Sequence, residues 1–395
     1  MSNKIVGGSL IIAGTAIGAG VLAVPVLTAE GGFLPAFVLY CISWLFSLAS
    51  GLYLLEVMTW LKDKKQINMF SMAEYTLGNV GKIAVCLTYL FLFYSLLIAY
   101  FCEGGNILFR IFGGKHLNVS WVRHVGPLGF ALLIGPILMS KTIVVDYCNR
   151  IFILGLVVTF GIFCFIGFGK IQLSLLSHFH WTTSINGLPI LFLAFGYQSI
   201  IPTLYYYMDK KVRDVKTAIF IGTAIPLILY IVWEAIVLGG VPLDFLVEAQ
   251  AQGYTAVEAL KQALSSSGIY IAGEFFGFFA LVSSFVGVAL GVMDFLADSL
   301  RWNKRTHRFS IFFFTFIIPL AWAICYPGIV LKCLNYAGGL GATLIIGFFP
   351  MLMVWRGRYG KHPHSTKHLV PGGKLTLLLM LLIIVINVTS LYYKF

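Results

Sequence analysis

The sequence predicts an all-α polytopic membrane protein with a single membrane domain over residues 1–395. Two observations lead to this fold class. Hydrophobic residues make up 59% of the chain and charged residues only 11%, whereas soluble domains carry about 25% charged residues. The apolar residues also gather in long runs, many close to the ~20 residues that a helix needs to cross a bilayer. Short basic loops separate these runs.

We expect eleven transmembrane helices, because eleven apolar runs are separated by charged or turn-forming segments. The ninth and tenth are divided only by the turn Tyr326-Pro-Gly328. No secretory signal is expected, since the first run lacks a small-residue cleavage site and is itself long enough to span. The expected spans are residues 5–29, 33–60, 83–111, 125–140, 151–169, 187–208, 217–240, 268–299, 309–325, 328–354 and 375–393.

The basic residues predict the orientation. If the N-terminus lies inside, the inner segments hold 20 of the 27 lysines and arginines, as the positive-inside rule requires. We therefore expect a cytoplasmic N-terminus, a periplasmic C-terminus and contact with membrane lipid. The net charge of +12 is explained by these loops, so no nucleic-acid partner is expected. The seven scattered cysteines are interpreted as packing residues rather than metal ligands or disulfides.

The first apolar run contains the segment Gly14-Thr-Ala-Ile-Gly-Ala-Gly20, followed by Val21-Leu-Ala-Val-Pro25. Each glycine destabilises a helix interior by about 1 kcal/mol relative to alanine. Backbone can leave the helix at membrane depth only where it is buried in protein or lines a polar cavity. The segment therefore predicts a broken helix with a binding site at its break. A helix-packing face at Gly14 and Gly18 is the alternative.

A second break is predicted in the sixth span, where Ala194-Phe-Gly-Tyr-Gln-Ser-Ile-Ile-Pro202 again combines glycine, polar groups and proline. The two interrupted spans lie five spans apart, which divides the chain into residues 5–169 and 187–354 with an extra helix at 375–393. Five is odd, so the second half enters the membrane in the opposite orientation. Paired interrupted spans of this kind indicate an inverted-repeat transporter with its site at the breaks.

These segments resemble the hydroxy/aromatic amino acid permease family of the amino acid-polyamine-organocation superfamily, and its tyrosine-specific members in particular. The resemblance implies a LeuT-like 5+5 inverted repeat with broken helices 1 and 6, and proton-coupled amino acid uptake across the bacterial inner membrane. Gln198 and Ser199 stand at the sixth-helix break, where relatives can carry other small or polar residues. The resemblance therefore does not define the pocket for the substrate side chain. The matching segments are Ala13–Pro25, Phe195–Pro202 with Tyr207-Met-Asp209, Ser283–Asp298, Leu55-Glu-Val57 and Tyr336-Ala-Gly338.

An amino acid presents a carboxylate, an ammonium and a side chain to such a site. The helix half that begins near Gly20 offers free N–H groups to the carboxylate, and the resemblance implies that Ala16, Ala19 and Gly20 supply this backbone. We expect carbonyls at Gly14, Thr15 and around Phe195 to take the ammonium. Aromatic residues would line the pocket for a substrate ring. The expected substrate-binding residues are Gly14, Thr15, Ala16, Gly18, Ala19, Gly20, Tyr100, Phe195, Gly196, Tyr197, Gln198 and Ser199.

Coupling candidates are the ionisable residues within spans, which are functional by default, and a hydroxyl pair in the eighth span. That pair helps to hold an ion in sodium-coupled relatives; helix–helix hydrogen bonding is the alternative. We expect H⁺ as the coupling ion, with Na⁺ as the alternative, and no cofactor or bound metal. The candidates are Ile17, Ser283, Ser284, Glu56, Glu103, Glu234 and Asp294.

The sequence therefore predicts a monomeric secondary active transporter, not an enzyme, that imports aromatic amino acids, tyrosine first, by proton symport. The alternative is a sodium-coupled or exchange transporter of another neutral amino acid, such as tryptophan, phenylalanine, serine or threonine. A channel is less favoured, because no filter-like segment is present. A membrane enzyme is less favoured still, because no span carries an H-x-x-x-H pattern.

Overall fold

Helices are the regular secondary structure of the described residues, and no β-strand occurs among them. The computed structural model describes residues 3–18, 20–61, 67–112, 120–140, 142–263, 267–300, 302–303, 306–326, 328–360 and 368–392. Nine helices there are long and apolar enough to cross a membrane. A tenth span results when the two helices of residues 4–31, bent by 56° at a break, are counted as one.

Six spans or near-spans are single helices: α3 (Phe33–Trp60), α5 (Ser120–Leu138), α6 (Thr142–Gly167), α11 (Val212–Gly240), α14 (Ser267–Ser299) and α19 (Gly373–Tyr392). A seventh, α4 (Met69–Phe112), has a kink at Gly78. Two more contain a π-helical stretch: α15 (Arg308–Phe312) with η5 (Phe313–Ile317) and α16 (Ile318–Cys325), then α17 (Val330–Tyr336) with η6 (Ala337–Phe348) and α18 (Phe349–Tyr359).

The two broken spans have the predicted positions. The first consists of α1 (Asn3–Ala16) and α2 (Gly20–Thr28), and the second of α9 (Leu188–Ala194), η4 (Gln198–Ile200) and α10 (Ile201–Tyr207). Short connecting helices complete the chain: η1 (Ala29–Gly31), η2 (Phe168–Lys170), α7 (Leu173–Leu176), α8 (Trp181–Ser184), η3 (Ile185–Gly187), α12 (Leu243–Gln252) and α13 (Ala256–Ala263).

Two predicted helix boundaries differ from those of the structure. The third helix was expected from residue 83, but the helical segment α4 begins at Met69, because a helical stretch before Gly78 joins the long apolar helix through a kink at that glycine (φ 76°, ψ −170°). The tenth was expected to end at residue 354, but α18 continues to Tyr359. In α5 the described apolar stretch His124–Leu138 is shorter than a full span, so the eleventh crossing stays a prediction.

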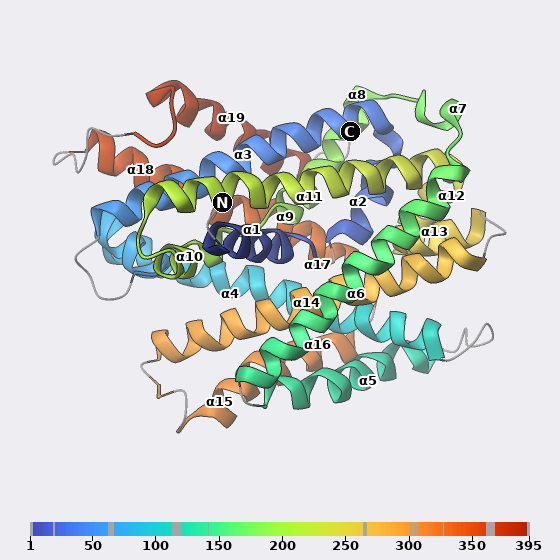
Figure 1. Cartoon of the computed structure of the whole chain (residues 1–395), viewed down its shortest axis with the longest axis horizontal. Helices are drawn as coiled ribbons and strands as arrows, with labels where there is room; N and C mark the ends of the chain where they lie inside the picture. The colour runs from blue at the N-terminus through green and yellow to red at the C-terminus, as the bar shows by residue number, and fades with distance from the viewer. Residues whose placement is uncertain are drawn as a thin grey trace.

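The broken spans occupy the middle of the bundle. Figure 1 shows α1, α2, α9 and α10 there, with α3 and α11 on one side and α4, α6 and α14 on the other. Contacts agree with this view: α1 packs against α11 and α14, and α9 packs against α2, α3 and η6. The packing is close enough that a Cβ on Gly338 of η6 would overlap the Pro189 carbonyl. The core of the molecule thus surrounds both interruptions.

Candidate binding site between two broken helices

The first break is held open by a side chain from a neighbouring helix. The last helical hydrogen bond of α1 joins the Ile17 amide to the Ala13 carbonyl at 2.9 Å. The Ile17 carbonyl has left the helical pattern, and it accepts a hydrogen bond of 2.8 Å from Ser284 Oγ of α14. The predicted residue Ala19 lies outside the described residues. The break is therefore a built structure rather than a frayed end.

Glycine at position 18 lies where two neighbouring helices approach the break closely. A Cβ there would lie 2.7 Å from Ser284 Oγ and 3.3 Å from Tyr100 Oη of α4. Tyr100 is buried, and its hydroxyl has no hydrogen-bond partner among the described residues. Ser283 instead donates to the Ala280 carbonyl of its own helix at 3.1 Å. Of the predicted serine pair, only Ser284 contacts the break.

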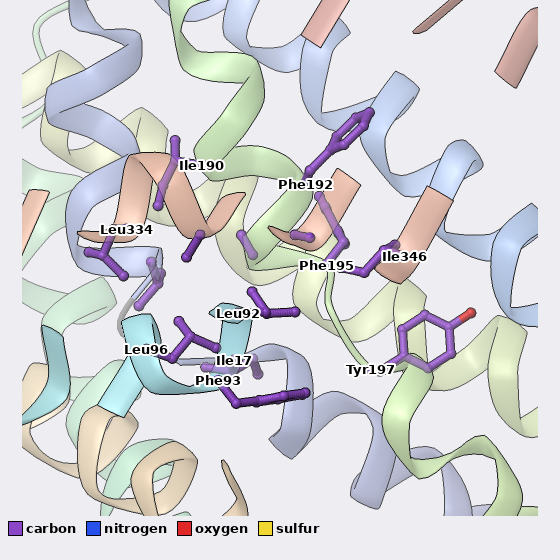
Figure 2. Packing of buried hydrophobic residues seen from close by; sticks show 14 of the residues in the cluster. Ile17, Leu92, Phe93, Leu96, Ile190, Phe192, Phe195, Tyr197, Leu334 and Ile346 are labelled. Carbon is purple, nitrogen blue, oxygen red and sulfur yellow. The ribbon is translucent and has the colours of Figure 1, made fainter. Parts of the chain in front are cut away.

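The second break rests on one serine of α3. Ser47 Oγ donates to the Phe195 carbonyl at 2.7 Å. The Tyr197 hydroxyl donates to the Ser47 carbonyl at 3.1 Å, and the Gln198 amide donates to Ser47 Oγ at 3.0 Å. Figure 2 shows the Tyr197 hydroxyl pointing away from Ile17, which belongs to the first break. The Tyr197 and Gln198 side chains thus fix the second break to α3.

The two breaks meet at a tyrosine that sequence reasoning missed. Tyr230 Oη of α11 lies 2.8 Å from the Ala16 carbonyl, where α1 ends, and 2.8 Å from the Ala194 carbonyl, where α9 ends. A Cβ on Gly20, where α2 begins, would lie 3.5 Å from Ala194 Cα. Two helix C-termini, which carry partial negative charge, and one helix N-terminus therefore converge here.

An aromatic cluster lies beside this meeting point. The fully buried Phe195 ring packs edge-on against Tyr230 at 5.4 Å and against Tyr40 of α3 at 6.5 Å. Gly196 follows, where a Cβ would come within 3.2 Å of Ile346. Ser199 is half-buried in η4. The apolar surroundings of the second break suit an aromatic guest.

Two predicted residues lie before the break rather than in it. Gly14 is within α1, where a Cβ would face Ile153 of α6 at 3.8 Å. Thr15 Oγ1 donates to the Ile11 carbonyl of the same helix at 2.8 Å. The carbonyl that the structure turns toward the second break is that of Ala16.

The acidic candidates have very different surroundings. Glu56 is buried and accepts two hydrogen bonds from Arg358, at 2.7 and 2.6 Å. Glu103 is paired with Arg110 at 2.9 Å, and the same guanidinium also meets Glu258 and Glu274. Asp294 is exposed.

Glu234 is the acidic candidate that contacts α2, the half-helix after the first break. It is fully buried, and its partners are the hydroxyls of Thr28, at the end of α2, and Tyr40. The described residues contain no group of histidine, cysteine or acidic side chains that could hold a metal ion.

Comparisons with known proteins agree over nearly the whole chain. The tryptophan/tyrosine permease family matches residues 1–390. Two relatives from Haemophilus influenzae are tyrosine-specific transport system 1, 30% identical over 96% of this chain and 94% of the relative, and tyrosine-specific transport system 2, 31% identical over 97% and 95%. A tryptophan-specific transport protein of the same organism is 28% identical over 98% and 96%. The family and these relatives are transport proteins, not enzymes.

Proposed function

Because the chain belongs to the tryptophan/tyrosine permease family, we propose that it is a secondary active transporter that imports aromatic amino acids, tyrosine first, by proton symport across the bacterial inner membrane. One observation carries the proposal. The C-termini of α1 and α9 converge on the Tyr230 hydroxyl, and Gly20, at the N-terminus of α2, packs against Ala194 at the end of α9. These helix ends offer the opposite partial charges that the two ends of a zwitterion need.

The proposed site has a separate region for the carboxylate, the ammonium and the ring of the substrate. The carboxylate would bind at the backbone of Gly18, Ala19 and Gly20, because the first N–H groups of a helix such as α2 have no carbonyl partner in the preceding turn and attract anions. Tyr100 adds a hydroxyl donor that no described residue uses. The ammonium binds the Ala16 and Ala194 carbonyls, taking the place of the Tyr230 hydroxyl.

The substrate ring would lie against Phe195 and Gly196 at the second break. Aromatic pairs there add about 0.5–1.5 kcal/mol beyond area burial. Gly14, Thr15, Tyr197, Gln198 and Ser199 shape the two half-helices around the site. Tyrosine, tryptophan and phenylalanine differ in ring size and hydroxyl content, so pocket shape would set the preference among them by about 1–3 kcal/mol.

Proton coupling is proposed over sodium coupling because of the hydroxyl pair in α14. A sodium ion at the first break would need oxygen ligands from both serines. Ser283 hydrogen-bonds within its own helix, so only Ser284 contacts the break, where its Oγ and the Ile17 carbonyl are directed at each other. Coupling is then assigned to a buried acid. Glu234 is the candidate that is fully buried and has hydroxyl groups, rather than a basic side chain, as partners.

The proposal includes an architecture. Eleven helices would cross the inner membrane as a LeuT-like five-plus-five inverted repeat, with α5 as the fourth span and α19 as the eleventh. The N-terminus would be cytoplasmic and the C-terminus periplasmic, in agreement with the positive-inside rule. The transporter would act as a monomer surrounded by lipid.

The test is uptake of labelled tyrosine into proteoliposomes with an imposed proton or sodium gradient. Saturable uptake that a proton gradient drives and an uncoupler abolishes is expected. Unlabelled tryptophan and phenylalanine should compete, and serine, threonine and glutamine should compete weakly. Uptake that follows sodium and ignores the proton gradient would overturn the coupling, and flux that does not saturate would favour a channel.

A further inference from the structure

Glu234 joins three helices through hydroxyl groups alone. It lies in the half of α11 toward Gly240 with no exposed surface. Thr28 Oγ1, at the last position of α2, contacts Glu234 Oε1. Tyr40 Oη of α3 donates to Glu234 Oε2 at 2.9 Å. A buried acid thereby touches the half-helix that begins at Gly20.

Counting hydrogens shows which protonation state fits this geometry. A threonine hydroxyl has one proton to donate. Thr28 Oγ1 lies 2.8 Å from the Val24 carbonyl as well as against Glu234 Oε1. If Glu234 were a carboxylate, both neighbours of Thr28 would be acceptors and one contact would lack a hydrogen. If Oε1 carries a proton, Glu234 donates to Thr28, Thr28 donates to Val24, and every contact is a hydrogen bond.

The electrostatic surroundings of Glu234 also favour its protonated form. A buried carboxylate without a counter-charge costs several kcal/mol, and no ion pair of the described residues includes Glu234. The titratable groups that face it are Tyr40 on α3 and Tyr230, one turn earlier on α11. No titratable side chain occurs on α2, and α6 contributes Phe163, which packs on Trp233.

Other helices that pack on α11 carry charged side chains that are paired with other residues or exposed. Glu258 of α13 is bound to Arg110, Lys4 of α1 is bound to Asp209, and Lys170 of η2 is exposed. A neutral, protonated Glu234 is therefore the state that this site stabilises.

We propose that Glu234 is the proton-binding site of transport and that its protonation docks α2. The inference rests on the proposed function, because it identifies where the symported proton binds. Loss of the proton from Oε1 removes the donor to Thr28 and leaves a buried negative charge, so α2 is released. Gly20 is at the other end of this nine-residue helix. Docking of α2 therefore positions the carboxylate cradle.

A second contact connects the proton site to the substrate site. The Tyr40 ring, whose hydroxyl holds Glu234, packs on Tyr230 at 6.1 Å and on Phe195 at 6.5 Å. The Tyr230 hydroxyl in turn lies 2.8 Å from both the Ala16 and the Ala194 carbonyl, which share its one proton. Proton binding and amino acid binding thus act on the same two broken helices.

The experiment uses Glu234→Gln in the full-length protein, reconstituted in proteoliposomes. The glutamine amide can donate to Thr28 and its oxygen can accept from Tyr40, so the variant imitates the protonated acid permanently. We expect tyrosine counterflow to persist, whereas accumulation driven by a proton gradient and the tyrosine-dependent proton flux are lost. Glu258→Gln is the matched control, since Arg110 keeps Glu103 and Glu274. It should retain both activities.

Proton flux coupled to tyrosine at the wild-type ratio in Glu234→Gln would overturn the inference. If that variant does not fold, Tyr40→Phe replaces it: loss of this donor weakens the charged form most, so the pH midpoint of uptake should move upward, and an unmoved midpoint would overturn the inference. Infrared spectroscopy separates the inference from the proposed function. A protonated-carboxyl band at neutral pH that Glu234→Gln removes supports the site even if tyrosine is not transported, and its absence from wild type counts against it.

Discussion

Arg358 of α18 binds Glu56 of α3 through two hydrogen bonds of 2.7 and 2.6 Å, although the residues are 302 positions apart. Both side chains are withdrawn from solvent. The backbone amide of Leu369 donates to the same carboxylate at 2.7 Å. Glu56 thus has a complete set of partners, and this geometry favours a structural role for it over proton coupling.

Removal of one partner of this ion pair should destabilise the protein. Arg358→Met leaves Glu56 buried without a counter-charge, which typically costs about 3–5 kcal/mol. We expect a lower melting temperature in detergent and reduced expression. The double change Glu56→Leu with Arg358→Met should recover much of this loss. A melting temperature unchanged by the single substitution would show that the pair contributes little to stability.

The glycines of the first break should differ sharply in their tolerance of a methyl group. Gly18→Ala places a Cβ 2.7 Å from Ser284 Oγ, whereas Gly20→Ala makes only ordinary contacts of 3.5 Å with Ala194. We expect Gly18→Ala to abolish tyrosine uptake and Gly20→Ala to keep most of it. Gly20→Leu should abolish uptake without loss of folding, because its side chain fills the cradle. The amount of each variant in the membrane, measured in parallel, separates these outcomes from misfolding.

Sequence patterns were sufficient for the two breaks because glycine and proline act locally on the backbone. The interrupted segments at Gly18 and at Phe195–Tyr197 were predicted from residue type alone and are present in the structure. Hydropathy likewise placed α3 at residues 33–60, where the structure has it. These features depend on near neighbours in the chain.

The partners of the breaks could not be predicted, because tertiary packing selects them. Tyr230 is one of 19 tyrosines, and nothing in its local pattern shows that it joins carbonyls 214 and 36 positions away. Ser47 is a small residue within a long apolar helix, yet it holds the whole second break. Its polarity inside an apolar run was the available signal, but serine often packs in membrane helices without such a role.

Tyr230→Phe should tighten amino acid binding while slowing transport. The substitution leaves the Ala16 and Ala194 carbonyls without their donor in the empty site, at a cost of about 1–3 kcal/mol for an unsatisfied buried group. An arriving ammonium relieves that cost, so the Kd for tyrosine should fall. Binding measured by scintillation proximity tests this. A higher Kd would instead mean that the hydroxyl itself holds the substrate.

The ion pair between Lys4 and Asp209 should not supply the pH dependence of uptake. Lys4 Nζ donates to Asp209 Oδ2 at 2.7 Å, and this hydrogen bond lowers the pKa of Asp209. The pair therefore contributes to stability above the ordinary aspartate pKa. This contribution is lost only as pH falls through the lowered pKa of Asp209, far below neutrality. Asp209→Asn should leave the pH profile of uptake unchanged. A displaced profile would assign the pair a part in coupling.

Tyr100 and Tyr197 should respond differently to loss of their hydroxyls. The Tyr100 hydroxyl is unused by the described residues and lies beside Gly18, so we expect it to donate to the substrate carboxylate. A hydrogen bond to a charged group contributes about 1.5–3 kcal/mol, so Tyr100→Phe should weaken tyrosine binding by about 10- to 100-fold. Tyr197→Phe removes a bond to the Ser47 carbonyl and should lower thermal stability with a smaller effect on affinity. Equal losses of affinity in both variants would show that Tyr100 acts on packing rather than on the substrate.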